Sequence, residues 1–205
     1  MKRTLLLGVA FAVTLGALGL AQSPGVNSNL AVVWTLPLDS VKRTYGAGVM
    51  GLQVSSAAVT DVFQICGATG ITTRITKLAM GGKVGTAIAL PYQIVRRTSA
   101  DTGGQSAVAV GTPYDSTFVS ASSVVTSWTD VPTALGTTLG SIIGTRLLGL
   151  SVSTTLASSD TNSYGTRPAS ALVLRSPTQC VAINFGTQTT ITGNALDIEA
   201  EWTEE

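Results

Sequence analysis

The feature that most constrains the fold is a regular alternation of apolar and acidic residues near the end of the chain. The stretch NALDIEAEW sets Leu196, Ile198, Ala200 and Trp202 against Asp197, Glu199 and Glu201. Side chains of a β-strand point alternately to its two faces, so a period of two predicts a strand with one face in a core. The other face is then in water.

The same alternation recurs upstream. QCVAINFG places Val181, Ile183 and Phe185 inward and Cys180, Ala182 and Asn184 outward, and DVFQICG sets Phe63 and Ile65 against Gln64 and Cys66. Further strands are predicted at Ala31–Leu36, Gly48–Val54, Ile71–Met80, Gly85–Val95, Ala107–Val110, Ser123–Trp128, Ser141–Leu150 and Ala171–Leu174. Turn residues separate them at MGGK (80–83), DTGGQ (101–105), GTPYD (111–115) and SSDTNS (158–163).

No apolar stripe with helical spacing persists along the chain. Only 11% of the 205 residues are charged and 44% are hydrophobic, which suits short strands and tight turns. We therefore expect an all-β fold, a β-sandwich or jelly-roll-like single domain preceded by an apolar N-terminal segment.

The first 21 residues have the pattern of a secretory signal. Lys2 and Arg3 precede an uncharged run from Thr4 to Leu20, and Ala21 ends a small-residue cleavage pattern. The run is short for a membrane-spanning helix, which needs about 20 apolar residues. We expect residues 1–21 to be a signal peptide or an apolar arm retained between copies in an assembly, which meets the membrane only transiently if it is a signal.

A polar, turn-rich stretch, QSPGVNSN, follows this segment at residues 22–29. Its composition is that of a linker. The predicted organisation is therefore a leader or arm at 1–21, a linker at 22–29 and a β-sandwich domain at 30–205.

Charge and composition argue against several classes of function. The net charge is +1 and the basic residues beyond the leader occur in pairs, so we expect no nucleic-acid binding. The chain has no histidine, which removes the usual general base and the commonest metal ligand. The loop RRTSADTGGQS (96–106) fits neither an EF-hand nor a P-loop, so we expect no cofactor and no metal.

Carboxylates are the remaining candidates for catalysis. Asp197, Glu199 and Glu201 follow one another on one strand face, and Glu204 and Glu205 lie beyond them. Paired acid and base carboxylates need unequal environments, and a regular exposed face gives similar ones. A solvated strand face is the better interpretation, and we expect no enzymatic activity.

Two kinds of side chain leave alternatives open. Cys66 and Cys180 both fall on the outward face of their strands and would form a disulfide if these strands were neighbours; two thiols that never pair is the equal alternative. Among the aromatic residues, Trp34 and Trp128 are the candidates for stacking on a sugar, although packing in the core is the simpler interpretation.

Two regions resemble a family of proteins encoded by tailed phages, prophages and environmental genomes. The matching segments are RTSADTGGQS, PYDS, SWTDVPTALGTTLGS, YGTRPASALVLRS and LDIEAEWTE, which include Asp115, Gly136, Arg167, Trp202 and Thr203. The match covers about half of the chain. It departs from the family pattern at Ser176 and Pro177, where the usual pair is Gly-Thr, and at the amino terminus.

This resemblance implies a β-sandwich or jelly-roll module in a virion, such as a capsid decoration or a head- or tail-associated protein. It carries over no catalytic or binding residues. We expect a non-enzymatic structural protein that assembles with itself, with capsid proteins or with other structural proteins, located on a virion, outside the cell or at its surface. The alternative is an exported β-sandwich module that binds glycans or a cell-surface partner.

Overall fold

The structure is a computed structural model that describes residues 42–54, 60–140, 142–152, 158–164, 172–186 and 195–205. The predictions for residues 1–21 and 22–29, the strand at Ala31–Leu36, and Trp34 all lie outside the described residues. They stay predictions. The first described strand begins at Arg43.

The described residues contain strands and no helix, which confirms the all-β prediction. The strands are β1 (Arg43–Leu52), β2 (Thr60–Cys66), β3 (Thr73–Lys83), β4 (Ile88–Arg97), β5 (Ser106–Val110), β6 (Thr112–Pro113), β7 (Val124–Trp128), β8 (Gly144–Leu150), β9 (Ser158–Ser163), β10 (Leu172–Leu174), β11 (Cys180–Phe185) and β12 (Ala195–Glu204).

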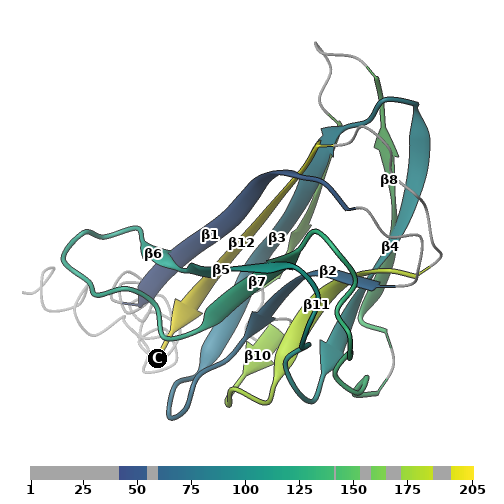
Figure 1. Ribbon diagram of the computed structural model, residues 1–205. Coiled ribbons are helices and arrows are strands. Elements are labelled where there is room, and N and C mark those ends of the chain that lie inside the picture. The colour runs from purple at the N-terminus through teal and green to yellow at the C-terminus, as the bar shows by residue number, and fades with distance from the viewer. Residues whose placement is uncertain (1–41, 55–59, 141, 153–157, 165–171, 187–194) are drawn as a thin grey trace, which may run out of the picture. The chain divides into compact units, whose positions relative to one another are not determined.

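The strands form two antiparallel sheets of six strands each, packed as a sandwich (Figure 1). In the first, which we call the β12 sheet, the order is β10-β3-β12-β1-β6, and β9 pairs with β3 as well. In the second, the β11 sheet, the order is β5-β7-β2-β11-β4-β8. Short connections between antiparallel strands suit a chain rich in turn residues.

The core lies between the sheets and takes one face of each. The alternation in NALDIEAEW is confirmed, because Leu196, Ala200 and Trp202 are fully buried and Ile198 is 2% exposed. The inward residues predicted for β2 and β11 are buried as well: Phe63, Ile65, Val181, Ile183 and Phe185. The period-two pattern therefore identified the core face of the central strands correctly.

The outward faces of β2 and β11 differ from the prediction. Gln64, Cys66, Cys180, Ala182 and Asn184 were expected to face solvent, and all are buried. The reason is a third layer of chain, in which the segment after β4 and the segment after β7 pair through isolated bridges at Thr102–Ala134 and Arg97–Thr138. We call residues 98–105 and 129–139 the loop layer. It covers the β11 sheet from outside.

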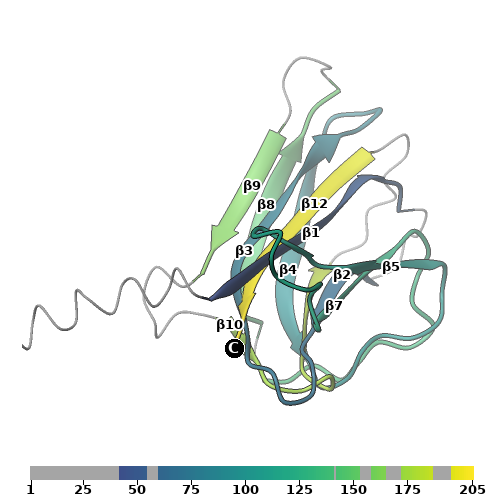
Figure 2. The same cartoon turned by 90° about the vertical axis from the view of Figure 1, so that its left-hand side faces the viewer.

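Besides GTPYD, which contains the two-residue strand β6, two segments predicted as turns belong to longer strands. SSDTNS forms β9, a polar strand at the edge of the β12 sheet (Figure 2). Its Asp160 carboxylate accepts a hydrogen bond of 2.8 Å from the Tyr92 hydroxyl. Asn162 donates to the same hydroxyl oxygen at 2.8 Å and accepts from Arg146 at 3.0 Å. These bonds link the two sheets, because Asp160 and Asn162 belong to the β12 sheet and Tyr92 and Arg146 to the β11 sheet. They also give the polar side chains of β9 hydrogen-bond partners, so this polar segment can form a strand. Burial is the main cause that raises the pKa of Tyr92 to about 12.

MGGK is the second such segment, and it continues β3 to Lys83. Gly81 and Gly82 lie between β12 on one side and β9 on the other, and both neighbours pair with them in register. Pairing on two sides outweighs the weak strand preference of glycine. Local turn chemistry was the wrong guide here because the strand partners come from distant parts of the sequence.

The last strand closes one end of the sandwich. The Trp202 ring stacks on Tyr45 with 6.1 Å between ring centroids, and its Nε1 donates to Glu204 at 3.1 Å. The Glu204 carboxylate also accepts the backbone N–H groups of Ser122 and Ser123. Burial acts to raise the pKa of Glu204, but these hydrogen bonds hold it below its ordinary value.

The packing around Trp202 leaves no room at Gly111. A Cβ at this position would collide with the Trp202 ring and with Ala121. We expect Gly111→Ala to lower the free energy of unfolding by about 1–3 kcal/mol, the usual cost of overpacking a core. Urea denaturation followed by tryptophan fluorescence measures the loss.

Gly144→Ala is the matched control. Gly144 also lies in the β11 sheet region, and a Cβ there would have nothing within 4 Å. Its stability is expected to stay within about 0.5 kcal/mol of the original. Equal destabilisation by the two substitutions would contradict the packing described around Trp202.

Candidate functional site

One edge of the β11 sheet exposes a group of valines. Val108 and Val110 of β5 are 65% and 57% exposed, and Val124 of β7 is 42% exposed. Val110 lies directly opposite Val124, and cross-strand partners place their side chains on the same face. We call Val108, Val110 and Val124 the valine patch. β5 ends the strand order of this sheet among the described strands.

The hydrogen-bond pattern shows where the β5 backbone points. Thr129 N–H donates to the Gln105 carbonyl at 3.0 Å, one step beyond the first β5–β7 pair. Antiparallel residues alternate between pairs that exchange hydrogen bonds and pairs that do not. Odd-numbered residues of β5 thus bond to β7. The N–H and C=O groups of Ser106, Val108 and Val110 therefore point toward the open edge.

Beyond Gly111 the same side of the chain is already paired with β1, through Thr112 and Pro113 of β6, so the unpaired edge is confined to β5. The sequence SAVAV has no charge and no proline, and its register with β7 is continuous from Ser106 to Val110. Proteins usually protect an edge with lysines, prolines or bulges, because an open edge is a template for another strand. The β5 edge, with its valine patch, is the candidate functional site.

The loop layer holds β5 in place. Trp128 is 2% exposed, and its Nε1 donates to the Gly103 carbonyl at 3.2 Å. Gly103 and Gly104 have φ of 73° and 71°, and a Cβ at either would collide with Thr133 or Val131. The backbone conformation and the close packing of this loop therefore require glycine at positions 103 and 104.

Beneath the loop layer lies a buried ion pair. Asp61 is fully buried and receives two hydrogen bonds from Arg97, at 2.8 Å from Nε and 2.7 Å from Nη2. Asn184 donates a third at 2.6 Å. Arg97 also donates from Nη1 to the hydroxyl of Thr138. This pair joins β2, β4 and β11 to the loop layer.

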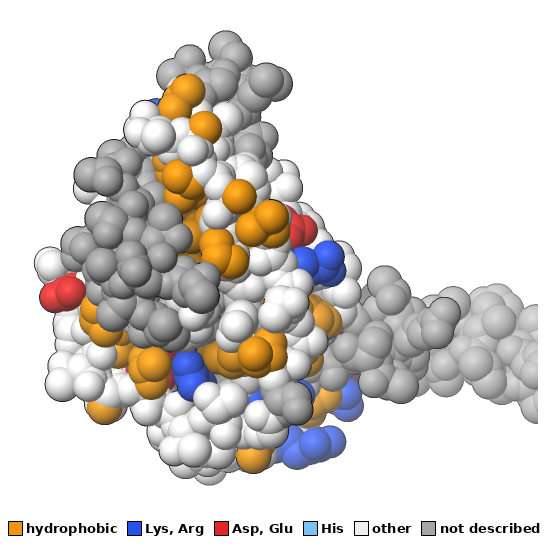
Figure 3. Space-filling model, turned by 90° about the vertical axis from the view of Figure 1, so that its right-hand side faces the viewer, with side chains coloured by type: hydrophobic (Ala, Val, Ile, Leu, Met, Phe, Trp, Pro, Cys, Tyr) orange, Lys and Arg blue, Asp and Glu red, His pale blue; other side chains and the backbone are white. Residues whose placement is uncertain are grey.

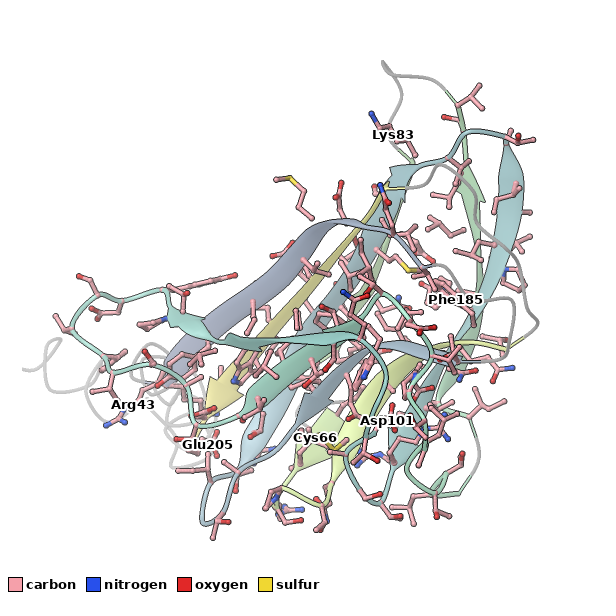
Figure 4. All side chains as sticks on the ribbon, viewed as in Figure 1. Arg43, Cys66, Lys83, Asp101, Phe185 and Glu205 are labelled. Carbon is pink, nitrogen blue, oxygen red and sulfur yellow. A yellow bond between two sulfur atoms is a disulfide. The ribbon has the colours of Figure 1, made fainter. Side chains whose placement is uncertain are left out.

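A second carboxylate, that of Asp101, lies on the segment after β4 (Figure 4) and is close enough to Asp61 and Arg97 to interact with both charges. Its N–H donates to Gln64 Oε1 at 3.0 Å, and its Oδ1 accepts from Gly136 N–H at 2.8 Å. Its Oδ2 is buried without a hydrogen-bond partner in the described structure. Burial first, and then the negative charge of Asp61, raises the pKa of Asp101 to about 7.

The structure brings the two cysteines together. Cys66 and Cys180 lie directly opposite each other on β2 and β11, with Cα atoms 4.1 Å apart, and form a disulfide. They belong to the covered face of the β11 sheet, and neither is on an open surface. Their position beside Val124, which pairs with Cys66, places the bridge next to the valine patch.

The residues predicted to contact a glycan are not brought together. Trp128 is buried under the loop layer, so its ring offers no open face, and Trp34 lies outside the described residues. Among the other aromatic residues, Tyr114 is 60% exposed, and its hydroxyl donates to Glu201 at 3.1 Å. A single exposed tyrosine is weak support for a sugar-stacking platform.

The acidic residues of β12 lie on the outer face of the β12 sheet. Asp197 accepts from Gly51 N–H at 2.9 Å, and Glu199 forms an ion pair of 3.0 Å with Lys77. A shallow groove of about 460 Å³ runs beside them. Glu204 differs from the others because it points inward, toward Ser122 and Ser123. Glu205 pairs with Arg74 at 3.2 Å.

The remaining motif residues have structural roles where they are described. Asp115 accepts the N–H and hydroxyl of Thr117 at 2.9 and 2.7 Å, which stabilises a turn and lowers the pKa of Asp115. Gly136 packs so closely on the Ser99 carbonyl that a side chain would collide. Arg167 lies outside the described residues.

Sequence analysis missed the residues that matter most at this edge. The strand Ala107–Val110 was predicted, but its position at an edge was not, because edge position depends on the order of strands. Asp61 and Arg97 were also missed. Their signal was present in the sequence, since a carboxylate within an apolar strand is rarely buried unless a cation pairs with it.

Among the described residues, no group of three or more His, Cys, Asp or Glu is arranged to hold a metal ion. The same residues include no helix of the length and hydropathy needed to cross a membrane. No protein-family model, curated protein or solved structure matches this chain.

The disulfide makes a prediction for stability. Replacing both cysteines, Cys66→Ala with Cys180→Ala, should lower the free energy of unfolding by about 2–4 kcal/mol, the usual contribution of a bridge that closes a long loop. Urea unfolding with and without reductant measures this. Reductant should destabilise the original protein and leave the double variant unchanged. Two reactive thiols in the denatured, unreduced protein would contradict the bridge.

The raised pKa of Asp101 makes a prediction for pH dependence. Its pKa is about 7 in the folded protein, against an ordinary value of 3.8, so the folded state binds more protons between these values. The free energy of unfolding should therefore fall as the pH rises from about 4 to about 7. Urea unfolding across this range should show the slope, and Asp101→Asn should flatten it.

Asp130→Asn is the control for that experiment. Asp130 is an exposed carboxylate of the same loop layer, and it accepts the N–H of Val131 at 2.8 Å. This substitution should keep the original slope. A flat profile in the unchanged protein would show that Asp101 is charged in the fold at neutral pH.

Proposed function

We propose that this chain is a non-enzymatic structural protein that works by assembly through the β5 edge. The observation that carries the proposal is the combination of an open strand edge with the uncharged valine patch. An apolar edge of this kind is costly to leave in water and favours the addition of another strand. A surface with few charged side chains also limits the electrostatic repulsion between packed copies.

The rest of the domain suits a rigid building block. The disulfide ties the two central strands of the β11 sheet together, and the buried Asp61–Arg97 pair fixes the loop layer behind β5. Charged side chains are also few on the face that bears β4 and β8, where hydrophobic side chains lie scattered among uncharged atoms (Figure 3). Low surface charge of this kind is compatible with close packing of neighbours.

The resemblance to proteins of phages and prophages supports a specific setting for this assembly. We propose a virion component, either a capsid decoration or a head- or tail-associated protein, and a surface-assembly subunit as the other form of the same function. Its partners are copies of itself, capsid proteins or other structural proteins. The location is a virion, the extracellular space or the cell surface.

The exported glycan-binding module is the weaker candidate. It depended on Trp34 and Trp128, and Trp128 is enclosed by the loop layer. No cluster of exposed aromatic rings stands in its place among the described residues. We therefore develop the assembly function alone.

A charge placed in the valine patch tests the proposal. Val108→Lys should abolish self-association, because it puts an ammonium group where an apolar contact forms. Light scattering after size-exclusion chromatography, over a range of protein concentrations, measures the mass. The unchanged protein should form oligomers that dissociate on dilution.

Leu147→Lys is the matched control. Leu147 lies on β8, the opposite edge of the same sheet, and it is 66% exposed against 65% for Val108. We expect Leu147→Lys to assemble as the original does. Loss of assembly in this variant but not in Val108→Lys would place the contact at β8. A protein that is monomeric at every concentration and absent from purified particles would refute the function.

A further inference from the structure

We infer that Asp101 carries a proton in the folded protein and that its Oδ2 hydroxyl donates to Asp61, so that loss of this proton loosens the loop layer from the β11 sheet. The bond lies inside one domain and is independent of the assembly function proposed above. Three features support it: the unused bonding capacity of the two carboxyl groups, their burial, and the balance of charge around them.

The carboxylate of Asp61 has one acceptor position left. Its Oδ1 accepts hydrogen bonds from Arg97 Nη2 at 2.7 Å and from Asn184 at 2.6 Å, whereas its Oδ2 accepts one bond, from Arg97 Nε at 2.8 Å. Each oxygen of an ionised carboxylate can accept about two hydrogen bonds. Asp61 Oδ2 therefore has room for one more donor.

Asp101 supplies the complementary atom. Its Oδ1 accepts the Gly136 N–H at 2.8 Å, and its Oδ2 is buried without a hydrogen-bond partner in the described structure. The carboxyl group of Asp101 lies within hydrogen-bonding reach of Asp61. Two ionised carboxylates cannot bond to each other, because both only accept. A proton on Asp101 Oδ2 makes this atom the donor that Asp61 Oδ2 can accept.

The charges of the cluster favour the same protonation state. Asp61 on β2 and Arg97 on β4 are the charged groups that act on Asp101. The neutral polar groups around the two carboxyls come from Gln64, Gly136, Asn184 and Thr138. Asp61 is fully buried and Asp101 is 7% exposed, so a single guanidinium would have to balance two buried carboxylates. An unbalanced buried charge is costly, and a proton on Asp101 removes it.

The bond connects the loop layer to the sheet, because Asp101 lies in the loop layer and Asp61 lies on β2. The pKa of Asp101 is raised from 3.8 to about 7, so the closed layer binds more protons between these values than an opened layer in which Asp101 meets water. The population of the opened layer should therefore rise about tenfold for each pH unit in this interval and level off above it. The loop layer is held most firmly in acid.

Hydrogen exchange of the Gly136 amide measures this opening. Its rate, divided by the rate of an unstructured chain at the same pH, gives the opened fraction of the loop layer. In the original protein this fraction should rise about tenfold per pH unit between about 5 and about 7. A fraction that stays constant over this range refutes the proposal.

Asp101→Asn tests the hydrogen bond. The amide keeps an oxygen for the Gly136 N–H and places a donor that does not titrate where the hydroxyl donates to Asp61. At a pH of about 8, Gly136 should exchange about tenfold more slowly, or slower still, in this variant than in the original protein, and the opened fraction should not depend on pH. Exchange as fast as in the original protein at this pH contradicts the bond.

Asp130→Asn is the matched control, because it removes an exposed carboxylate of the same loop layer. Its opened fraction should follow the pH dependence of the original protein. A flat profile in this variant would show that Asp101 is not the group that titrates.

Asp61→Asn tests the partner. Without the charge of Asp61, Arg97 is left to pair with Asp101, which favours its ionised form. NMR of the Asp101 carboxyl carbon gives the titration midpoint, expected at about 7 in the original protein and lower by about 1–3 pH units in the variant. An unchanged midpoint in a folded variant refutes Asp61 as the partner. If circular dichroism shows that this variant does not fold, the comparison of Asp101→Asn with the original protein decides.

Discussion

The buried ion pair between Asp61 and Arg97 organises the outer half of this molecule. A carboxylate that is fully buried is tolerated only when a cation and further hydrogen bonds satisfy it, and removal of one partner leaves an uncompensated charge. Arg97 supplies two bonds from β4 and Asn184 supplies one from β11, while Asp61 comes from β2. Three strands of one sheet are therefore held in a single alignment, and Thr138 adds the loop layer to them.

The loop layer leaves only part of the outer face of the β11 sheet exposed. Because the loop layer covers the middle of the β11 sheet, Cys66, Cys180 and Asn184 are enclosed, and the open surface moves outward to β5 and β7. The two glycines of the loop, Gly103 and Gly104, then turn the chain directly into β5. An uncharged edge strand held by a rigid layer is well suited to adding a strand from another copy.

Most of the motif residues that the structure describes have roles in folding. Gly136 gives Asp101 a hydrogen bond, Trp202 fills the end of the core, and Glu204 satisfies the backbone at Ser122. These are the roles of residues in a structural scaffold. They agree with a proposed function that depends on the shape and the edge of the domain.

The sequence by itself determined the class of fold, because a period of two in residues such as Leu196, Ile198 and Trp202 allows a single core face. It determined most strands for the same reason. It also indicated that Cys66 and Cys180 both lie on the face of their strands opposite the core residues. It could not determine that β9 is a strand, that Trp128 is covered, or that β5 is an edge. Those features depend on which distant segments pair and on the extra layer over the β11 sheet, and only the tertiary structure decided them, since burial is a property of neighbours in space.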